Sequence, residues 1–140
     1  VQAFNVAVSN KRGSANFTRV LGNTTSSHLT GSKTPYGELE TFAVELADIK
    51  ELIPSADLIK MDVEGHEKEI ILAVENWKNT DAIIEIGNNE NAQAIYDHLT
   101  RLQVNAFAQK IGWKRVEKLE DMPTSHRDGS LFITSKDGLP

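Results

Sequence analysis

The sequence predicts an α/β fold with a mostly parallel sheet, on three observations. Segments with strand and helix character alternate from residue 57 to residue 102. The strand segments 57–63 and 81–87 are apolar without clean polar alternation, which is typical of central strands covered on both faces. The segments that follow them place apolar residues at helical spacing. Since a strand-helix-strand order requires a crossover connection, we expect these strands to pair in parallel.

The first part of the chain is predicted to hold strands, one long loop and a short helix. Residues 1–9, 15–21 and 40–46 show strand patterns, and the first and last of these alternate clearly. Residues 22–37 are rich in Gly, Ser and Thr and predict a loop of a length that is usually functional. Residues 47–53 are predicted to form the helix, which a proline ends.

The second part is predicted to alternate between helices and strands. A helix is expected from Glu64 to about Lys78, and its core stripe would be Ile70, Ile71, Val74 and Trp77. A second helix follows segment 81–87, with a stripe made of Ala92, Ile95, Tyr96, Leu99 and Leu102. Three strand-like segments come last, and the final two are expected to form an antiparallel hairpin at one edge: 105–111, 113–119 and 129–135.

Composition excludes several classes of function. A length of 140 residues suits one domain with a real core. The net charge is −5 and the sequence has no basic cluster, which argues against nucleic acid as a partner. No apolar run reaches the roughly 18 residues that a membrane span needs, and no signal peptide is visible, so we expect a cytoplasmic protein. No G-x-G pair, P-loop or G-x-S-x-G elbow is present.

Acidic residues follow the two central strand segments. Ligands of open α/β sheets bind beyond the carboxyl ends of the strands. If the two strands are neighbours, Asp62, Glu64 and Glu85 converge at one edge. Carboxylates placed there can bind a hydroxyl or ammonium group, act as a general base or hold a divalent cation.

A purely structural interpretation competes for each of these acids. Acids in the first turn of a helix are favoured by its dipole, which explains Glu67 and part of Glu64. The dipole explains Asp62 less well, because Asp62 lies at the end of a strand expected to be buried. Glu85 stands inside an apolar strand, and Lys60 is one candidate for its partner.

The histidines offer weaker candidates. His66 has the chemistry of a general base, although a solvated surface position on the first helical turn is the simpler interpretation. Ser27 and His28 lie in the long loop, which either closes over a substrate or is only a mobile surface loop. The histidine spacing predicts no zinc site.

The stretch "LIKMDVEGHEKEI", residues 58–70, resembles the "IKIDVEGxE" signature of the FkbM family of S-adenosylmethionine-dependent methyltransferases. Asp62, Glu64, Gly65 and Glu67 match the signature, and Lys60 precedes them as in the family. Weaker matches follow in the family's order: "NVAVSNKRGSANF", "FAVELADIKEL", "DAIIEIG" and "DGSLFIT". Together these segments span most of the chain.

The resemblance implies a Rossmann-like methyltransferase sheet, S-adenosylmethionine as cofactor and methyl transfer to a hydroxyl oxygen of a small molecule or glycan. In the family, the glycine-rich cofactor loop lies N-terminal to the segment that "NVAVS" of this chain resembles. We therefore expect residues 1–140 to be one partial FkbM-like domain, its C-terminal portion without the first strands, or a divergent relative that has lost them. Such a chain is expected to form a homodimer, bind a partner fragment or be poorly soluble.

The resemblance also assigns roles to residues. Asp62, Glu64, Glu85 and His66 are the candidate catalytic residues. Asp62, Val63 and Gly65 are the candidates for cofactor binding, and Ser27 and His28 for substrate binding. No residue is assigned to a metal. Two alternatives remain: a non-catalytic α/β binding module, and a magnesium-dependent enzyme that uses Asp62, Glu64 and Glu85.

Overall fold

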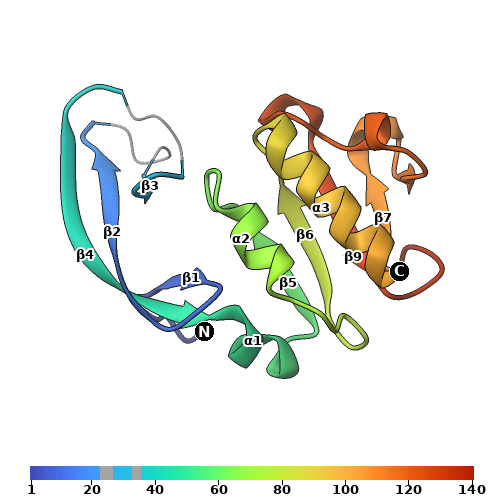
Figure 1. Ribbon diagram of the computed structural model, residues 1–140, viewed down its shortest axis with the longest axis horizontal. Helices are drawn as coiled ribbons and strands as arrows, with labels where there is room; N and C mark the ends of the chain where they lie inside the picture. The colour runs from blue at the N-terminus through green and yellow to red at the C-terminus, as the bar shows by residue number, and fades with distance from the viewer. Residues whose placement is uncertain (23–26, 33–35) are drawn as a thin grey trace.

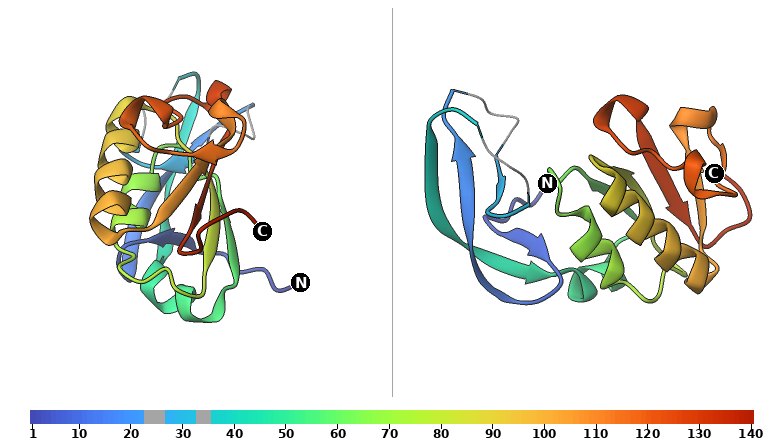
Figure 2. Two further views of the ribbon diagram at one scale, coloured as in Figure 1. Left: turned by 90° about the vertical axis from the view of Figure 1, so that its right-hand side faces the viewer. Right: turned by 45° about the horizontal axis from the view of Figure 1, so that its top comes forward.

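The computed structural model describes residues 1–22, 27–32 and 36–140. These residues form a four-stranded sheet and a five-stranded sheet, which lie side by side with the helices α2 (Glu67–Leu72) and α3 (Asn89–Leu102) on one face of the larger sheet (Figures 1 and 2). The α/β class predicted from the sequence is confirmed.

The four-stranded sheet has the order β1-β4-β2-β3, with the bounds β1 (Ala7–Ser9), β2 (Gly13–Val20), β3 (His28–Leu29) and β4 (Leu39–Asp48). Only β1 and β4 pair in parallel. The long antiparallel ladder of β2 and β4 sets Phe17 opposite Phe42, with ring centroids 5.6 Å apart. This hairpin extends away from the larger sheet (Figure 1).

A short helical segment links the two sheets. It consists of α1 (Ile49–Leu52) and the 3-10 turn η1 (Ile53–Ser55). Asp48 starts α1, because its carboxylate accepts a hydrogen bond from the Lys50 main-chain N–H at 3.0 Å. The chain then enters β5, the strand that leads to the acidic motif.

The five-stranded sheet has the order β5-β6-β9-β7-β8, with the bounds β5 (Leu58–Met61), β6 (Asp81–Glu85), β7 (Asn105–Ala108), β8 (Lys114–Arg115) and β9 (Ser130–Thr134). Three 3-10 turns complete this half: η2 (Gln109–Ile111), η3 (Leu119–Asp121) and η4 (His126–Asp128). The core lies between this sheet and the helices, and its fully buried side chains include Ile70, Ile71, Ile84, Ile95, Leu131 and Ile133.

The expectation of a mostly parallel sheet is wrong, since both sheets are mixed. In the larger one, β5 and β6 are parallel, but β9 inserts antiparallel between β6 and β7. The final two strand-like segments therefore do not form a hairpin with each other; β8 pairs with β7 at the edge. Strand order depends on which distant segments meet, and local periodicity carries no such information.

Several element bounds also differ from the prediction, at the start of the chain and around the acidic motif above all. Residues 1–6 have no regular structure, and strand β1 begins at Ala7. The helix expected over 64–78 is confined to Glu67–Leu72. Its start is delayed because Glu64 and Gly65 have positive φ angles, and past its end the Asn76 side chain accepts a hydrogen bond from the Lys78 N–H at 3.1 Å, a turn that competes with helix.

No helix in the described ranges is long and apolar enough to cross a membrane.

Candidate functional site

The acidic motif forms a tight turn between β5 and α2. Glu64 has a φ of 52° and Gly65 a φ of 103°. A Cβ atom on Gly65 would lie 2.3 Å from the main-chain oxygen of Ser32, so this position has no room for a side chain. The glycine thus lets the segment after β3 pack directly onto the motif.

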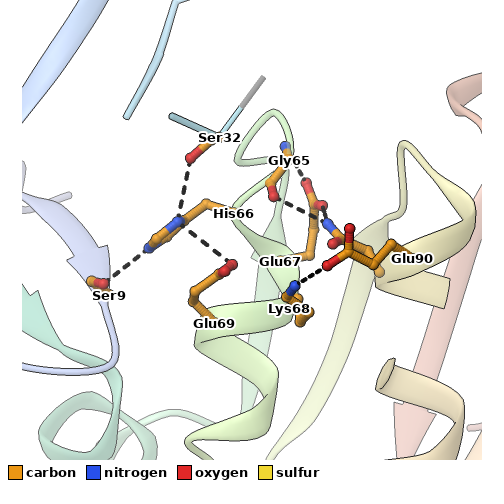
Figure 3. A network of polar contacts seen from close by, with 9 residues as sticks. Ser9, Ser32, Gly65, His66, Glu67, Lys68, Glu69 and Glu90 are labelled. Atoms are coloured by element: carbon orange, nitrogen blue, oxygen red, sulfur yellow. Dashed lines mark hydrogen bonds and ion pairs between the residues drawn. The ribbon is translucent and has the colours of Figure 1, made fainter. Parts of the chain in front are cut away.

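Glu67 stabilises this turn through hydrogen bonds. Its side chain is fully buried, although acids are rarely buried without partners. One carboxylate oxygen accepts the Gly65 N–H at 2.9 Å, and the other accepts the Asn91 amide at 2.8 Å. The Asn91 amide also donates to the Gly65 carbonyl at 3.1 Å. Glu67 therefore links the motif turn to α3, which is a larger role than the helix-dipole effect expected from the sequence (Figure 3).

His66 lies at the centre of a polar network rather than on a solvated surface, which corrects the simpler expectation for this residue. Figure 3 shows its ring between serines from two other parts of the chain. The Nε2 atom lies 2.9 Å from the Ser9 hydroxyl, and the Nδ1 atom lies 3.3 Å from the Ser32 hydroxyl. A carboxylate oxygen of Glu69 lies 3.7 Å from Nδ1.

Burial lowers the pKa of His66 from its ordinary value, although the nearby carboxylates of Glu69 and Glu67 act in the opposite direction. The imidazole is therefore neutral at pH 7, with one ring nitrogen able to accept a proton. A neutral imidazole beside hydroxyl groups has the chemistry of a general base.

Asp62 and Glu85 occupy adjacent strand ends, as the sequence predicted for neighbouring strands. Met61 and Ile84 are register partners in the parallel pair of β5 and β6, and the two acids follow them directly. Asp62 is exposed rather than buried, and its carboxylate makes no hydrogen bond or ion pair with the described part of the chain. Glu85 is half-buried, and its carboxylate contacts the Lys60 ammonium at 3.1 Å, the partner that the sequence suggested.

A second histidine, His126, also lies at this edge. A Cβ atom on Gly87, just past β6, would lie 2.9 Å from Nε2 of His126. The neighbouring Asp128 instead accepts the Thr124 N–H at 2.8 Å, which lowers the pKa of this carboxyl. Asp128 thus shapes the turn, while the His126 ring packs against the end of β6.

Ser27 and His28 belong to the segment that forms strand β3. The long loop expected over 22–37 contains strand β3, which pairs with β2 and sets His28 opposite Thr18. His28 is buried, with 2% of its surface exposed, so it is not a side chain of a mobile surface loop. Ser27 precedes this strand and is partly buried.

The residues around His66 border a groove of about 480 Å³ between the four-stranded sheet and the starts of the helices α2 and α3, which cover the second sheet. We call it the inter-sheet groove, and its lining includes Ser9, Lys11, Ala15, Leu29, Ser32, Leu46, Gly65, His66, Lys68, Glu69, Asn88, Glu90 and Asn91. Asp62, Glu85, Ser27 and His28 are not among the lining residues.

Sequence reasoning missed three members of the network: Ser9, Ser32 and Asn91. Ser9 and His66 are 57 residues apart and Ser32 and His66 are 34 apart, so no local pattern joins them. The buried role of Glu67 did have a signal, because the family signature includes an acid at that position.

The described ranges hold no group of three or more His, Asp or Glu side chains arranged to bind a metal ion. The alternative of a magnesium site at Asp62, Glu64 and Glu85 therefore gains no support.

A family model described as the methyltransferase FkbM domain matches residues 2–118. Searches of the curated proteins and of the solved structures returned no match.

Proposed function

Because the chain belongs to the methyltransferase FkbM domain family, we propose that it transfers a methyl group from S-adenosylmethionine to a hydroxyl oxygen of a small molecule or sugar. The family membership supports methyl transfer in general. The methyl donor, the oxygen acceptor and the residue roles below are the specific content of the proposal.

The observation that carries the proposal is the exposed carboxylate of Asp62 at the carboxyl end of β5. It follows a sheet strand, stands beside Glu85 and makes no bond to the described part of the chain. Carboxylates with structural roles in this molecule are bonded, as Glu67 is by Gly65 and Asn91. A carboxylate left open at a ligand-binding edge suits an acceptor hydroxyl or a cationic ligand.

The donor set at this turn fits S-adenosylmethionine, which supplies an electrophilic methyl group on a sulfonium. Asp62 offers negative charge to a cation, and Val63 and Gly65 would contact the cofactor from the adjoining turn. In this proposal Asp62 orients the acceptor hydroxyl, Glu64 and Glu85 add negative charge, and His66 accepts a proton. Ser27 and His28 would belong to a substrate-side segment.

We further propose that residues 1–140 form one part of a Rossmann-like methyltransferase domain. Strands β5 and β6 are parallel, and β7 runs in the same direction because β9 lies antiparallel between β6 and β7. Helices α2 and α3 pack on one face of these strands, as crossover connections do (Figure 1).

Calorimetric titration with S-adenosylhomocysteine tests the donor, and Asp62→Asn tests the site. We expect micromolar binding by the wild type and at least tenfold weaker binding by Asp62→Asn. Asp57→Asn is the matched control, because Asp57 is exposed at the other end of the same strand and loses the same charge. Wild-type protein that does not bind S-adenosylhomocysteine would favour the non-catalytic binding module and overturn the proposal.

The reaction is tested separately with radiolabelled S-adenosylmethionine and a panel of sugars and small alcohols. Label transferred to a hydroxyl oxygen by the wild type, and lost in Asp62→Asn but kept in Asp57→Asn, is the expected result. Label found on nitrogen or carbon acceptors would keep the enzyme class but contradict the oxygen acceptor.

A further inference from the structure

The inter-sheet groove has a composition that selects a particular chemistry. Its polar walls come from the end of β1 and the turn after it, the segment after β3, the start of α2 and the start of α3. These walls carry hydroxyl, imidazole, amide, ammonium and carboxylate groups, all of which exchange hydrogen bonds with hydroxyl groups. A ligand rich in hydroxyls is the natural complement of such walls.

The charges in the groove cancel. Lys11 and Lys68 are balanced by Glu69 and Glu90, and the ammonium of Lys68 already pairs with the carboxylate of Glu90. The fifth titratable group, His66, is held neutral by burial, which lowers its pKa. A phosphate or carboxylate ligand would find no excess of positive charge here, whereas a neutral ligand meets no electrostatic penalty.

One wall of the groove is apolar. Ala15, Leu29 and Leu46 project from the same face of the first sheet. Leu29 is the register partner of Phe17, which lies two residues from Ala15 on β2. Leu46 lies two residues along β4 from Val44, which is the register partner of Ala15. A sugar ring presents a face of C–H groups as well as a rim of hydroxyls, so it can pack on these side chains while its hydroxyls meet the opposite wall. The volume of about 480 Å³ lies in the range of small-molecule sites.

We propose that the inter-sheet groove binds a neutral, polyhydroxylated ligand of the size of one or two sugar rings, with His66 as a hydrogen-bond partner of a ligand hydroxyl. This inference rests on the proposed function, for which it supplies the acceptor class. The groove meets the motif turn at Gly65 and His66, so a ligand in it contacts the segment that carries Asp62.

The test uses a panel of methyl glycosides of glucose, mannose, galactose and rhamnose, with glucose 6-phosphate as the anionic comparison. Binding to the wild-type chain is followed by calorimetry and by the ¹H–¹⁵N spectrum of the histidine side chains. We expect at least one neutral glycoside to bind and to shift the His66 signals. The signals of His98, whose Nε2 contacts the Val74 carbonyl at 2.9 Å away from the groove, should not move.

Ala15→Trp places a large side chain into the groove and should weaken glycoside binding at least tenfold. Ala43→Trp is the matched control: Ala43 is exposed on the opposite face of the same hairpin, opposite Asn16, and the variant should bind as the wild type does. Thermal unfolding of both variants checks that they fold. If Ala15→Trp does not fold, the shift of the His66 signals in the wild-type spectrum still tests the proposal.

Three outcomes would overturn the inference: no glycoside binds, a glycoside binds without shifting the His66 signals, or glucose 6-phosphate binds more tightly than every neutral sugar. Titration with S-adenosylhomocysteine separates this inference from the proposed function. Binding of S-adenosylhomocysteine without glycoside binding removes only the acceptor class, whereas glycoside binding without S-adenosylhomocysteine binding leaves a sugar-binding module.

Discussion

At the scale of single residues, Gly65 meets two independent requirements. Its φ of 103° is strained for any residue with a side chain, and the Ser32 carbonyl occupies the space of a Cβ atom. The first requirement is local, whereas the second arises only because a distant segment packs on the turn. Substitution separates these two effects.

Gly65→Ala should lower the free energy of unfolding by about 3 kcal/mol, since positive-φ strain of about 1–2 kcal/mol adds to displacement of the Ser32 segment. Gly112→Ala is the control, because Gly112 has a φ of 72° but nothing within 4 Å of the added Cβ. Gly112→Ala should lower the free energy of unfolding only by the positive-φ strain, about 1–2 kcal/mol. Urea unfolding measures both, and equal losses would show that the Ser32 contact contributes no stability.

His66 predicts the pH dependence of stability. Burial lowers its pKa in the folded state, so between that pKa and the unfolded value of about 6.5 the unfolded chain binds more protons. Its contribution to stability is therefore complete above about pH 6.5 and is lost as the pH falls. Unfolding free energies measured from pH 7.5 to 5.5 should decline less steeply in His66→Gln than in the wild type. Parallel curves would contradict this role.

At the scale of elements, the bond between Glu67 and Asn91 joins α2 to α3. Both partners are buried, and each loses a charge-assisted hydrogen bond if the other is removed. A second link between the same regions is the ion pair of Glu75 and Arg101, 3.0 Å apart, whose side chains are 63% and 59% exposed. The two links differ mainly in burial.

A double-mutant cycle with Glu67→Ala and Asn91→Ala should give a coupling energy of about 1–3 kcal/mol, because removal of either partner leaves the other unsatisfied in the core. The cycle with Glu75→Ala and Arg101→Ala should give about 0.5 kcal/mol or less, because exposed pairs are screened by water. Denaturant unfolding of the four single variants and two double variants measures both. A larger coupling for the exposed pair would reject this account of the link.

Elements with a strong local pattern were predictable from the sequence. The alternation of 40–46, the apolar run of 81–87 and the stripe after it correspond to β4, β6 and α3. Helix α3 also has local signals at its ends: Asn88 accepts the Asn91 N–H at 2.8 Å, and Gln103 ends the helix in the left-handed conformation. Strand β1 and helix α2 were predicted too long, because apolar spacing continues past the points where backbone conformation changes.

At the scale of the whole molecule, each sheet ends in a strand with an open edge. In the described part of the chain β5 pairs only with β6, and β1 pairs only with β4. Leu58 on β5 is 58% exposed. Open edges that carry apolar side chains are sites of association with another strand.

We therefore expect the 140-residue chain to self-associate as its concentration rises, as judged by sedimentation velocity. Leu58→Lys should reduce the association by adding charge to the β5 edge. Leu72→Lys is the control, since Leu72 is exposed on α2 and not on a sheet edge. A monodisperse monomer at about 100 μM would contradict the expectation.

The amino-acid sequence was sufficient to predict the α/β class, the motif that identifies the family, and the acids that follow two strand segments. These features depend on contiguous residues, so composition, periodicity and spacing contain them. Asp62 and Glu85 were brought to adjacent strand ends by a short crossover, which a strand-helix-strand order already implies.

Three features became visible in the folded chain alone: β9 inserts between β6 and β7, Glu67 is buried against Asn91, and His66 lies between Ser9 and Ser32. Each of these contacts joins segments that are far apart in the chain. Their formation depends on the packing of whole elements and the closure of long loops, and no short stretch of sequence encodes it. The motif could therefore be identified from the stretch "LIKMDVEGHEKEI", whereas the groove beside it could not be predicted from the sequence.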